Sequence, residues 1–256
     1  MTYLVVCSVA LLVSCLTFFS GFGLGTLLLP AFTLFFPIEQ AIAMTAVVHM
    51  LNGMFKLALV GRHADRVTVL RFGVPAIVAA FFGAWVLQWL TSLTPVYRYT
   101  AFDHTLEVTP VKLVVGLLLL MFALLELLPR LRDLTFKPSY MPVGGLLSGF
   151  FGGLAGMQGA LRSACLVRAG LSKEAFIATG VVTAVLVDVS RLGVYTRSLV
   201  HVDALDYPLL TAAILSAFLG AFAGSQYLKK MTMPGIQRLV AAALFVAALG
   251  LVMGVL

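Results

Sequence analysis

Residues 20–25 read SGFGLG and lie inside an apolar run, residues 2–36, that contains no charged side chain. A similar segment, SGFFGGLAG at residues 148–156, lies inside a second apolar run at residues 140–170. Clustered glycines weaken a helix, because each costs roughly 1 kcal/mol relative to alanine. Irregular backbone at membrane depth is tolerated only where it is buried in protein or lines a cavity. The two segments therefore predict two helices that are broken inside a membrane.

The composition excludes a soluble domain. Of the 256 residues, 61% are hydrophobic and 11% are charged, and the mean hydropathy is +1.08. Soluble proteins carry about 25% charged residues. The net charge of +7 comes mainly from short loops between apolar runs, where Lys and Arg set the orientation of membrane proteins. We expect an all-α integral membrane protein with no cofactor, no metal site and no nucleic-acid partner.

We expect one membrane domain built from two homologous repeats, residues 1–138 and 139–256. Four short segments recur in the same order at offsets of 128, 134, 137 and 126: SGFGLG with SGFFGG, AIAMT with AFIAT, FGAW with LGAF, and KLV with RLV. Such internal repeats are common in transporters. The expected elements are a broken helix at 2–36, helices at 39–61, 72–90 and 110–128, a long loop at 91–109, a second broken helix at 140–170, and helices at 172–195, 207–228 and 235–256.

Two topologies compete for this pattern. If each broken run crosses the membrane once, the two repeats are parallel and the loop Lys and Arg residues divide seven to seven. If each broken run is a re-entrant hairpin, each repeat has three full spans and the second repeat is inverted. The division is then eleven to three, and this bias favours the hairpins, with the basic side cytoplasmic. The basic side holds Arg62, Arg66, Arg71, Arg130, Arg132, Lys137, Arg168, Lys173, Lys229, Lys230 and Arg238, and the other holds Arg98, Lys112 and Arg197.

The hairpin tips are the candidate binding site. A helix that starts after a break presents unpaired N–H groups and the positive end of its dipole, which suits an anion. Glycines let the anion approach the backbone, so bulk at Gly23 or Gly153 is expected to weaken binding. The alternative is that the glycines serve close helix packing. The candidate substrate-binding residues are Ser20, Gly21, Gly23, Gly25, Thr26, Ser148, Gly152, Gly153, Gly156, Gln158 and Arg162.

Charged and polar residues inside membrane helices form a second set of candidates, because they are costly there and are usually functional. Arg162 follows the second tip and is the best candidate for a charged contact, since its guanidinium holds oxyanions bidentately. Its alternative role is snorkelling to the surface. A coupling or gating role is assigned to His49, Asn52, Lys56, Asp188 and Arg191. The alternatives are snorkelling for Lys56, a structural Asp188–Arg191 ion pair, and an interhelical hydrogen bond for His49.

Both glycine-rich regions resemble the TauE/SafE (TSUP) family. The resemblance rests on SGFGLGTLLLPAF at 20–32 followed by PIEQAIAMTA at 37–46, and on SGFFGGLAGMQGALRSACL at 148–166 followed by LSKEAFIATG at 171–180. It implies a multi-pass carrier of the bacterial or archaeal inner membrane, usually an exporter, for sulfite, thiosulfate, sulfoacetate or other organosulfonates. The second tip departs from the pattern of the first, because Met157-Gln158 and then Arg162 stand where a simpler glycine–proline pattern is expected.

The expected function is a secondary transporter, and an exporter, of small sulfur-containing anions held at the midplane between the two tips. A passive anion channel and a carrier of another small organic anion are the alternatives. An enzyme is not expected, because the chain lacks a nucleophile–base pair, two metal-spaced acids and a C-x-x-C pair. It also lacks a G-x-x-x-x-G-K-[ST] nucleotide-binding motif, so transport must draw on an ion gradient, the substrate gradient or a partner. The expected partners are the anionic substrate and the lipid bilayer, with a homodimer left open.

The hairpin topology predicts that both termini face outward. A reporter that is active only in the cytoplasm should be active when fused after Lys137 and silent when fused after Leu256. Activity after Leu256 would contradict the topology.

Overall fold

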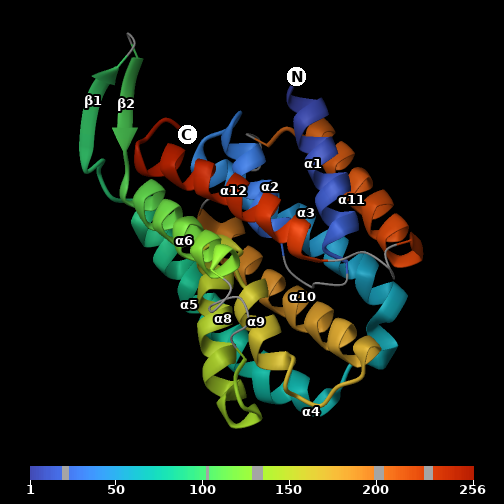
Figure 1. Cartoon of the computed structure of the whole chain (residues 1–256). Coiled ribbons are helices and arrows are strands. Elements are labelled where there is room, and N and C mark those ends of the chain that lie inside the picture. Colours follow the sequence, from blue (N-terminus) through green and yellow to red (C-terminus); the bar gives the residue numbers. More distant parts are fainter. Residues whose placement is uncertain (19–22, 102–103, 129–134, 199–204, 228–232) are drawn as a thin grey trace.

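The computed structural model describes residues 1–18, 23–101, 104–128, 135–198, 205–227 and 233–256. It is a bundle of helices with one small β-hairpin at its end (Figure 1). The α-helices are α1 (Thr2–Leu16), α2 (Leu24–Thr33), α3 (Ile38–Val60), α4 (Arg66–Thr68), α5 (Val74–Thr91), α6 (Pro110–Leu127), α8 (Met141–Ala155), α9 (Gly159–Leu166), α10 (Lys173–Ser198), α11 (Tyr207–Tyr227) and α12 (Met233–Val252). Short 3₁₀ helices η1 (Gly61–His63) and η3 (Pro138–Tyr140) and a π-helix η2 (Val69–Gly73) accompany them.

The bundle is a multi-pass membrane protein. Within the described residues, four helical segments are long and apolar enough to cross a membrane, and these are Ile38–His63, Arg66–Thr91, Lys173–Tyr195 and Tyr207–Gln226. Three shorter apolar helices accompany them at Thr2–Leu16, Leu24–Thr33 and Pro110–Leu125. Large apolar side chains such as Phe81, Trp85 and Leu219 are exposed on the outer surface of the bundle, where lipid replaces water as the solvent.

The expected loop at 91–109 contains a β-hairpin, which the all-α expectation did not include. Strand β1 (Tyr97–Ala101) pairs antiparallel with β2 (His104–Val108). Aromatic and threonine residues favour extended backbone, and Arg98 lies opposite Glu107 with its Nε 2.9 Å from the carboxylate. The hairpin leaves the helical architecture unchanged.

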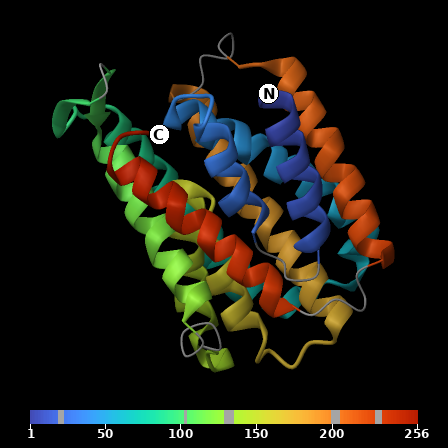
Figure 2. The same ribbon diagram turned by 45° about the horizontal axis from the view of Figure 1, so that its top comes forward.

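Both apolar runs are interrupted at a glycine with left-handed backbone. Gly23 precedes α2 with φ 116°, and Gly156 follows α8 with φ 76°. Only glycine adopts such angles without strain. Figures 1 and 2 show that α1 and α2 run in opposite directions, as do α8 and α9, and that the two ends of the chain lie toward the same end of the bundle. Helices α1 and α2 are therefore antiparallel neighbours, and so are α8 and α9.

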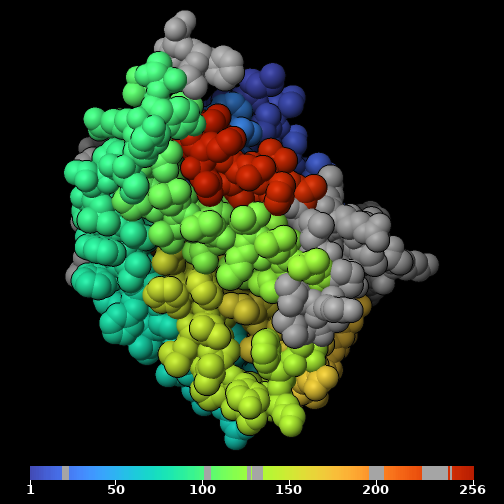
Figure 3. Space-filling model, turned by 60° about the vertical axis from the view of Figure 1, so that its left-hand side comes forward, coloured from blue at the N-terminus to red at the C-terminus, as the bar shows by residue number. Residues whose placement is uncertain are grey.

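The two halves of the chain interlock through reciprocal helix pairs. Helix α1 packs against α11, and α8 packs against α5. Helix α3 packs against α10, and α6 packs against α12. Figure 3 shows the last pair, α6 in green and α12 in red, side by side on one face. Every one of these pairs joins an element of residues 1–138 to an element of residues 139–256.

Glycines make the closest of these contacts possible. A Cβ atom on Gly149 would lie 2.1 Å from the carbonyl oxygen of Ala76, and one on Gly153 would lie 2.0 Å from that of Ala80. The equivalent pair has the same feature, since a Cβ on Gly220 would lie 2.1 Å from the carbonyl oxygen of Leu11. Small residues allow membrane helices to approach at backbone distance, and dispersion contacts then stabilise the pair.

The seam between α5 and α8 predicts a stability effect. Gly153→Ala should force the two backbones apart and lower the free energy of unfolding by about 1–3 kcal/mol, the usual cost of overpacking. Gly193→Ala in α10 is the matched control, because a Cβ there meets no atom within 4 Å and alanine favours a helix. Melting temperatures in detergent measure both. Equal melting temperatures for the two variants would contradict close packing at Gly153.

Candidate functional site

The two hairpin tips meet in the middle of the fold. A Cβ atom on Gly25, in the first turn of α2, would lie 3.1 Å from the carbonyl oxygen of Gly156 and 3.4 Å from Cδ2 of His49. The start of α2, the end of α8 and the middle of α3 therefore converge at one point. Because Gly25 has no side chain, the three elements can approach each other there.

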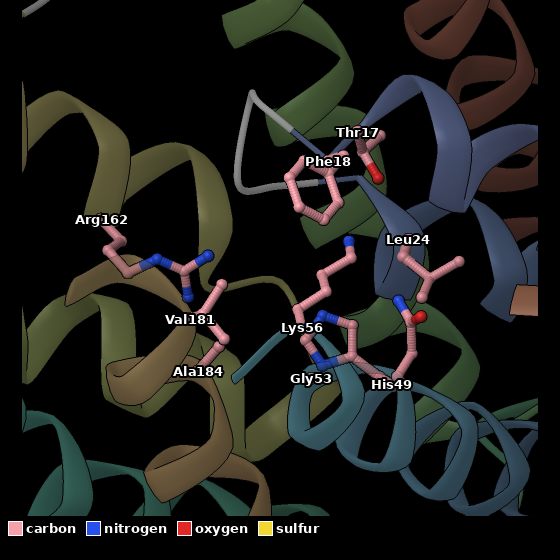
Figure 4. Close-up of a pocket in the computed structure, with 10 residues that line it drawn as sticks. Thr17, Phe18, Leu24, His49, Gly53, Lys56, Arg162, Val181 and Ala184 are labelled. Carbon is pink, nitrogen blue, oxygen red and sulfur yellow. The ribbon is translucent and has the colours of Figure 1, made fainter. Parts of the chain in front are cut away.

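A small pocket lies beside this meeting point (Figure 4). Its volume is about 30 Å³, and a single water needs roughly 10–15 Å³ on the same measure. The pocket thus has room for a few waters or one small ion. Its lining comes from the segment directly after α1 and from α2, α3, α9 and α10, and consists of Thr17, Phe18, Leu24, His49, Asn52, Gly53, Lys56, Arg162, Val181 and Ala184.

Two cationic side chains reach the pocket from opposite halves of the chain. Lys56 of α3 is 8% exposed and Arg162 of α9 is 3% exposed, and Figure 4 shows their charged groups on two sides of the same space. The ammonium of Lys56 lies 5.6 Å from the centroid of the Phe18 ring, within cation–π range. Arg162 Nη1 donates a hydrogen bond of 3.2 Å to Oε1 of Gln158.

The buried charge of this region is positive. Among the described residues, the buried charged side chains are Lys56, Arg162, Asp188 and Arg191. Three of the four are cations. Like charges in a low-dielectric interior repel one another, and burying a cation is costly unless an opposite charge compensates it. Asp188 is the one acid among these four side chains, and its carboxylate contacts His49 and Arg191.

A hydrogen-bonded network centred on Asp188 supports the pocket. Oδ1 of Asp188 accepts a hydrogen bond of 3.0 Å from Nε of Arg191 and lies 2.8 Å from Nη2 of the same guanidinium. Nε2 of Gln158 lies 3.5 Å from this oxygen, and Nδ1 of His49 lies 2.6 Å from Oδ2. The Tyr195 hydroxyl donates to the Gly153 carbonyl oxygen. The network thus ties α3, α10 and the second hairpin together.

The Arg191 side chain occupies the space beside Gly156, at the end of α8, that a larger residue would need. A Cβ on Gly156 would lie 2.7 Å from Nη1 of Arg191. This buried Nη1 has no hydrogen-bond acceptor in the described part of the chain. The guanidinium therefore fills the space beside the tip, and Gly156 is required both by its positive φ and by this contact.

The pocket contains only part of the residues expected from the sequence. His49, Asn52, Lys56 and Arg162 line it, while Gly25, Gly156, Gln158, Asp188 and Arg191 form the layer next to it. Ser20 and Gly21 lie outside the described residues.

The other expected residues take part in local structure. Thr26 donates to the Gly23 carbonyl at 2.9 Å, and Ser148 donates to the Gln158 carbonyl at 2.8 Å. A Cβ on Gly152 would meet the side chains of Gln158 and Val187, and Gly153 lies against the α5 backbone. Gly153 therefore lies where close helix packing requires a glycine, because its Cα faces the Ala80 backbone and the residue does not line the pocket.

Several lining residues were not predicted from the sequence. They are Thr17, Phe18, Leu24, Gly53, Val181 and Ala184. Helical spacing could have indicated some of them, because Gly53 lies four residues after His49, and Ala184 lies four residues before Asp188. Thr17 and Phe18 follow the end of α1 and carry no comparable signal.

These features define a polytopic helical membrane protein with a small pocket lined by two buried cationic side chains. The family model described as "Sulfite exporter TauE/SafE" matches residues 6–251 of the chain. The chain belongs to this family, which confirms the resemblance seen in its sequence and places it among membrane transport proteins. No curated protein and no solved structure matched the chain.

Proposed function

We propose that the chain is a secondary transporter that exports small sulfur-containing anions, such as sulfite, sulfoacetate or a related organosulfonate. The observation that carries this proposal is the pair of buried cations, Lys56 and Arg162, on one small pocket in the membrane interior. Family membership supports the chemical class of the substrate. No covalent step is needed, because the pocket acts by binding and release.

The residues around the pocket suit a sulfur oxyanion. The planar guanidinium of Arg162 can hold two oxygens at once, while the ammonium of Lys56 acts as a compact point charge. The N-terminal end of α2 adds a positive helix dipole at Leu24. A pocket of about 30 Å³ favours an ion of the size of sulfite, and larger sulfonates would require the hairpins to separate.

We further propose that the two halves are inverted repeats with both termini outside and the basic loops in the cytoplasm of a bacterial or archaeal cell. The reciprocal packing of α1 with α11 and of α8 with α5 supports this arrangement, because each hairpin contacts the same element of the opposite half. The eleven-to-three division of Lys and Arg also supports it. Rocking of one repeat against the other would then expose the pocket alternately to the two sides.

Removal of the Arg162 side chain tests the proposal. Arg162→Ala should abolish saturable sulfite flux in proteoliposomes and weaken sulfite binding by about ten- to a hundred-fold, since a hydrogen bond to a charged group contributes about 1.5–3 kcal/mol. Arg162→Lys should recover little, because an ammonium cannot replace the bidentate fork.

The matched control is Arg168→Ala, which removes an exposed arginine shortly after the same helix. It should keep wild-type flux. Full flux in Arg162→Ala would contradict the proposal, and flux in the wild type that neither saturates nor shows counterflow would indicate a channel instead of a carrier.

A further inference from the structure

His49 links the anion pocket to a buried carboxylate. Its ring lines the pocket, and its Nδ1 lies 2.6 Å from Oδ2 of Asp188 on the opposite half of the chain. The His49 side chain is 15% exposed, whereas that of Asp188 is 0% exposed. The ring therefore stands between a fully buried acid and a space open to a small ion.

The hydrogen bond determines which ring nitrogen can change its protonation. An ionised carboxylate only accepts hydrogen bonds, so Nδ1 carries a proton and donates a hydrogen bond to Asp188. The nitrogen that gains or loses a proton is then Nε2. It is bonded to Cδ2, the atom that lies 3.4 Å from a Cβ built on Gly25 at the first hairpin tip. Imidazole is the side chain whose charge changes between about pH 5 and 8.

The charged groups around His49 make its protonation depend on the anion. Helix α10 contributes Asp188 and Arg191, α9 contributes Arg162, and α3 itself contributes Lys56. Helix α1 contributes the Cys15 thiol near Lys56, α2 has no titratable side chain, and α11 has only Tyr207 and Tyr227 at its ends. With the pocket empty, the Asp188 carboxylate favours a positive charge on His49, whereas Lys56, Arg162 and Arg191 oppose it. A bound anion removes that opposition.

We propose that His49 takes up a proton when the anion binds, so that binding at this pocket is coupled to protons. Asp188 is the positioning residue, because it holds Nδ1 and directs Nε2 away from itself. Coupling between two ligands is reciprocal, so a proton on His49 strengthens anion binding as much as the anion favours the proton. This inference rests on the proposed function and adds proton linkage to it.

Calorimetry on the purified full-length protein tests the coupling. Thiosulfate is the probe, because it stays a dianion over the whole range, whereas sulfite itself takes up a proton. In the wild type, affinity should be about 5- to 150-fold higher near pH 5.5 than near pH 8, the usual range of coupling between sites. Titrations in two buffers with different ionisation enthalpies should show net proton uptake on binding, with at most about one proton per anion.

The variant that tests the residue is His49→Gln, whose amide can still donate to Asp188 but cannot titrate. It should bind thiosulfate with an affinity that is nearly independent of pH and with little proton uptake. His63→Gln is the matched control, because His63 is exposed in the turn after the same helix, and it should keep the wild-type pH dependence.

Two results overturn the inference alone: thiosulfate binding by the wild type without proton uptake, or undiminished proton uptake in a folded His49→Gln protein. Failure of the wild type to bind thiosulfate or sulfite at any pH overturns the proposed binding site, and the inference falls with it. Thiosulfate binding by the wild type without proton uptake overturns the inference even if His49→Gln does not fold.

Discussion

Two positive charges held close together in a low-dielectric interior are the constraint on which the rest of this structure depends. Lys56 and Arg162 come from different halves of the chain and are both buried at one pocket. An isolated buried charge costs several kcal/mol even after relaxation. The Phe18 ring beside Lys56 and the Gln158 amide oxygen bonded to Arg162 offset part of this cost. The anion proposed for this pocket would offset more of it, which would give the site affinity and selectivity for negative charge.

The glycines matter because they bring these groups together. Gly25 and Gly156 allow the two tips to touch, and Gly156 leaves space for Arg191. Along α8, Gly149 and Gly153 allow the second hairpin to lie at backbone distance from α5. The glycines of one run thus have two separate roles. Gly156 permits the turn at the end of α8, and Gly149 and Gly153 permit close packing of α8 against α5. The Asp188 carboxylate contacts both Arg191 and His49, so this buried acid is surrounded by basic side chains.

The membrane class, the breaks and the lone charges could be predicted from the sequence, because hydropathy, clustered glycine and buried charge are local properties. Arg162 and Lys56 stood out as charges in apolar runs, and both line the pocket. The role of Gly153 could not be predicted, because it depends on which helix lies opposite, and periodicity does not specify that partner. The His49–Asp188 contact joins residues 139 positions apart, so it exists only after α3 and α10 have packed. Phe18 lines the pocket without any distinguishing pattern in the sequence.

The most direct test of the central claim is a crystal structure with bound thiosulfate, located by the anomalous signal of its sulfur atoms. We expect a peak in the pocket between the two hairpin tips, with thiosulfate oxygens within hydrogen-bonding distance of the Arg162 guanidinium and the Lys56 ammonium. An ordered thiosulfate found only at exposed arginines such as Arg62 or Arg66, with an empty pocket at saturating concentration, would contradict the account.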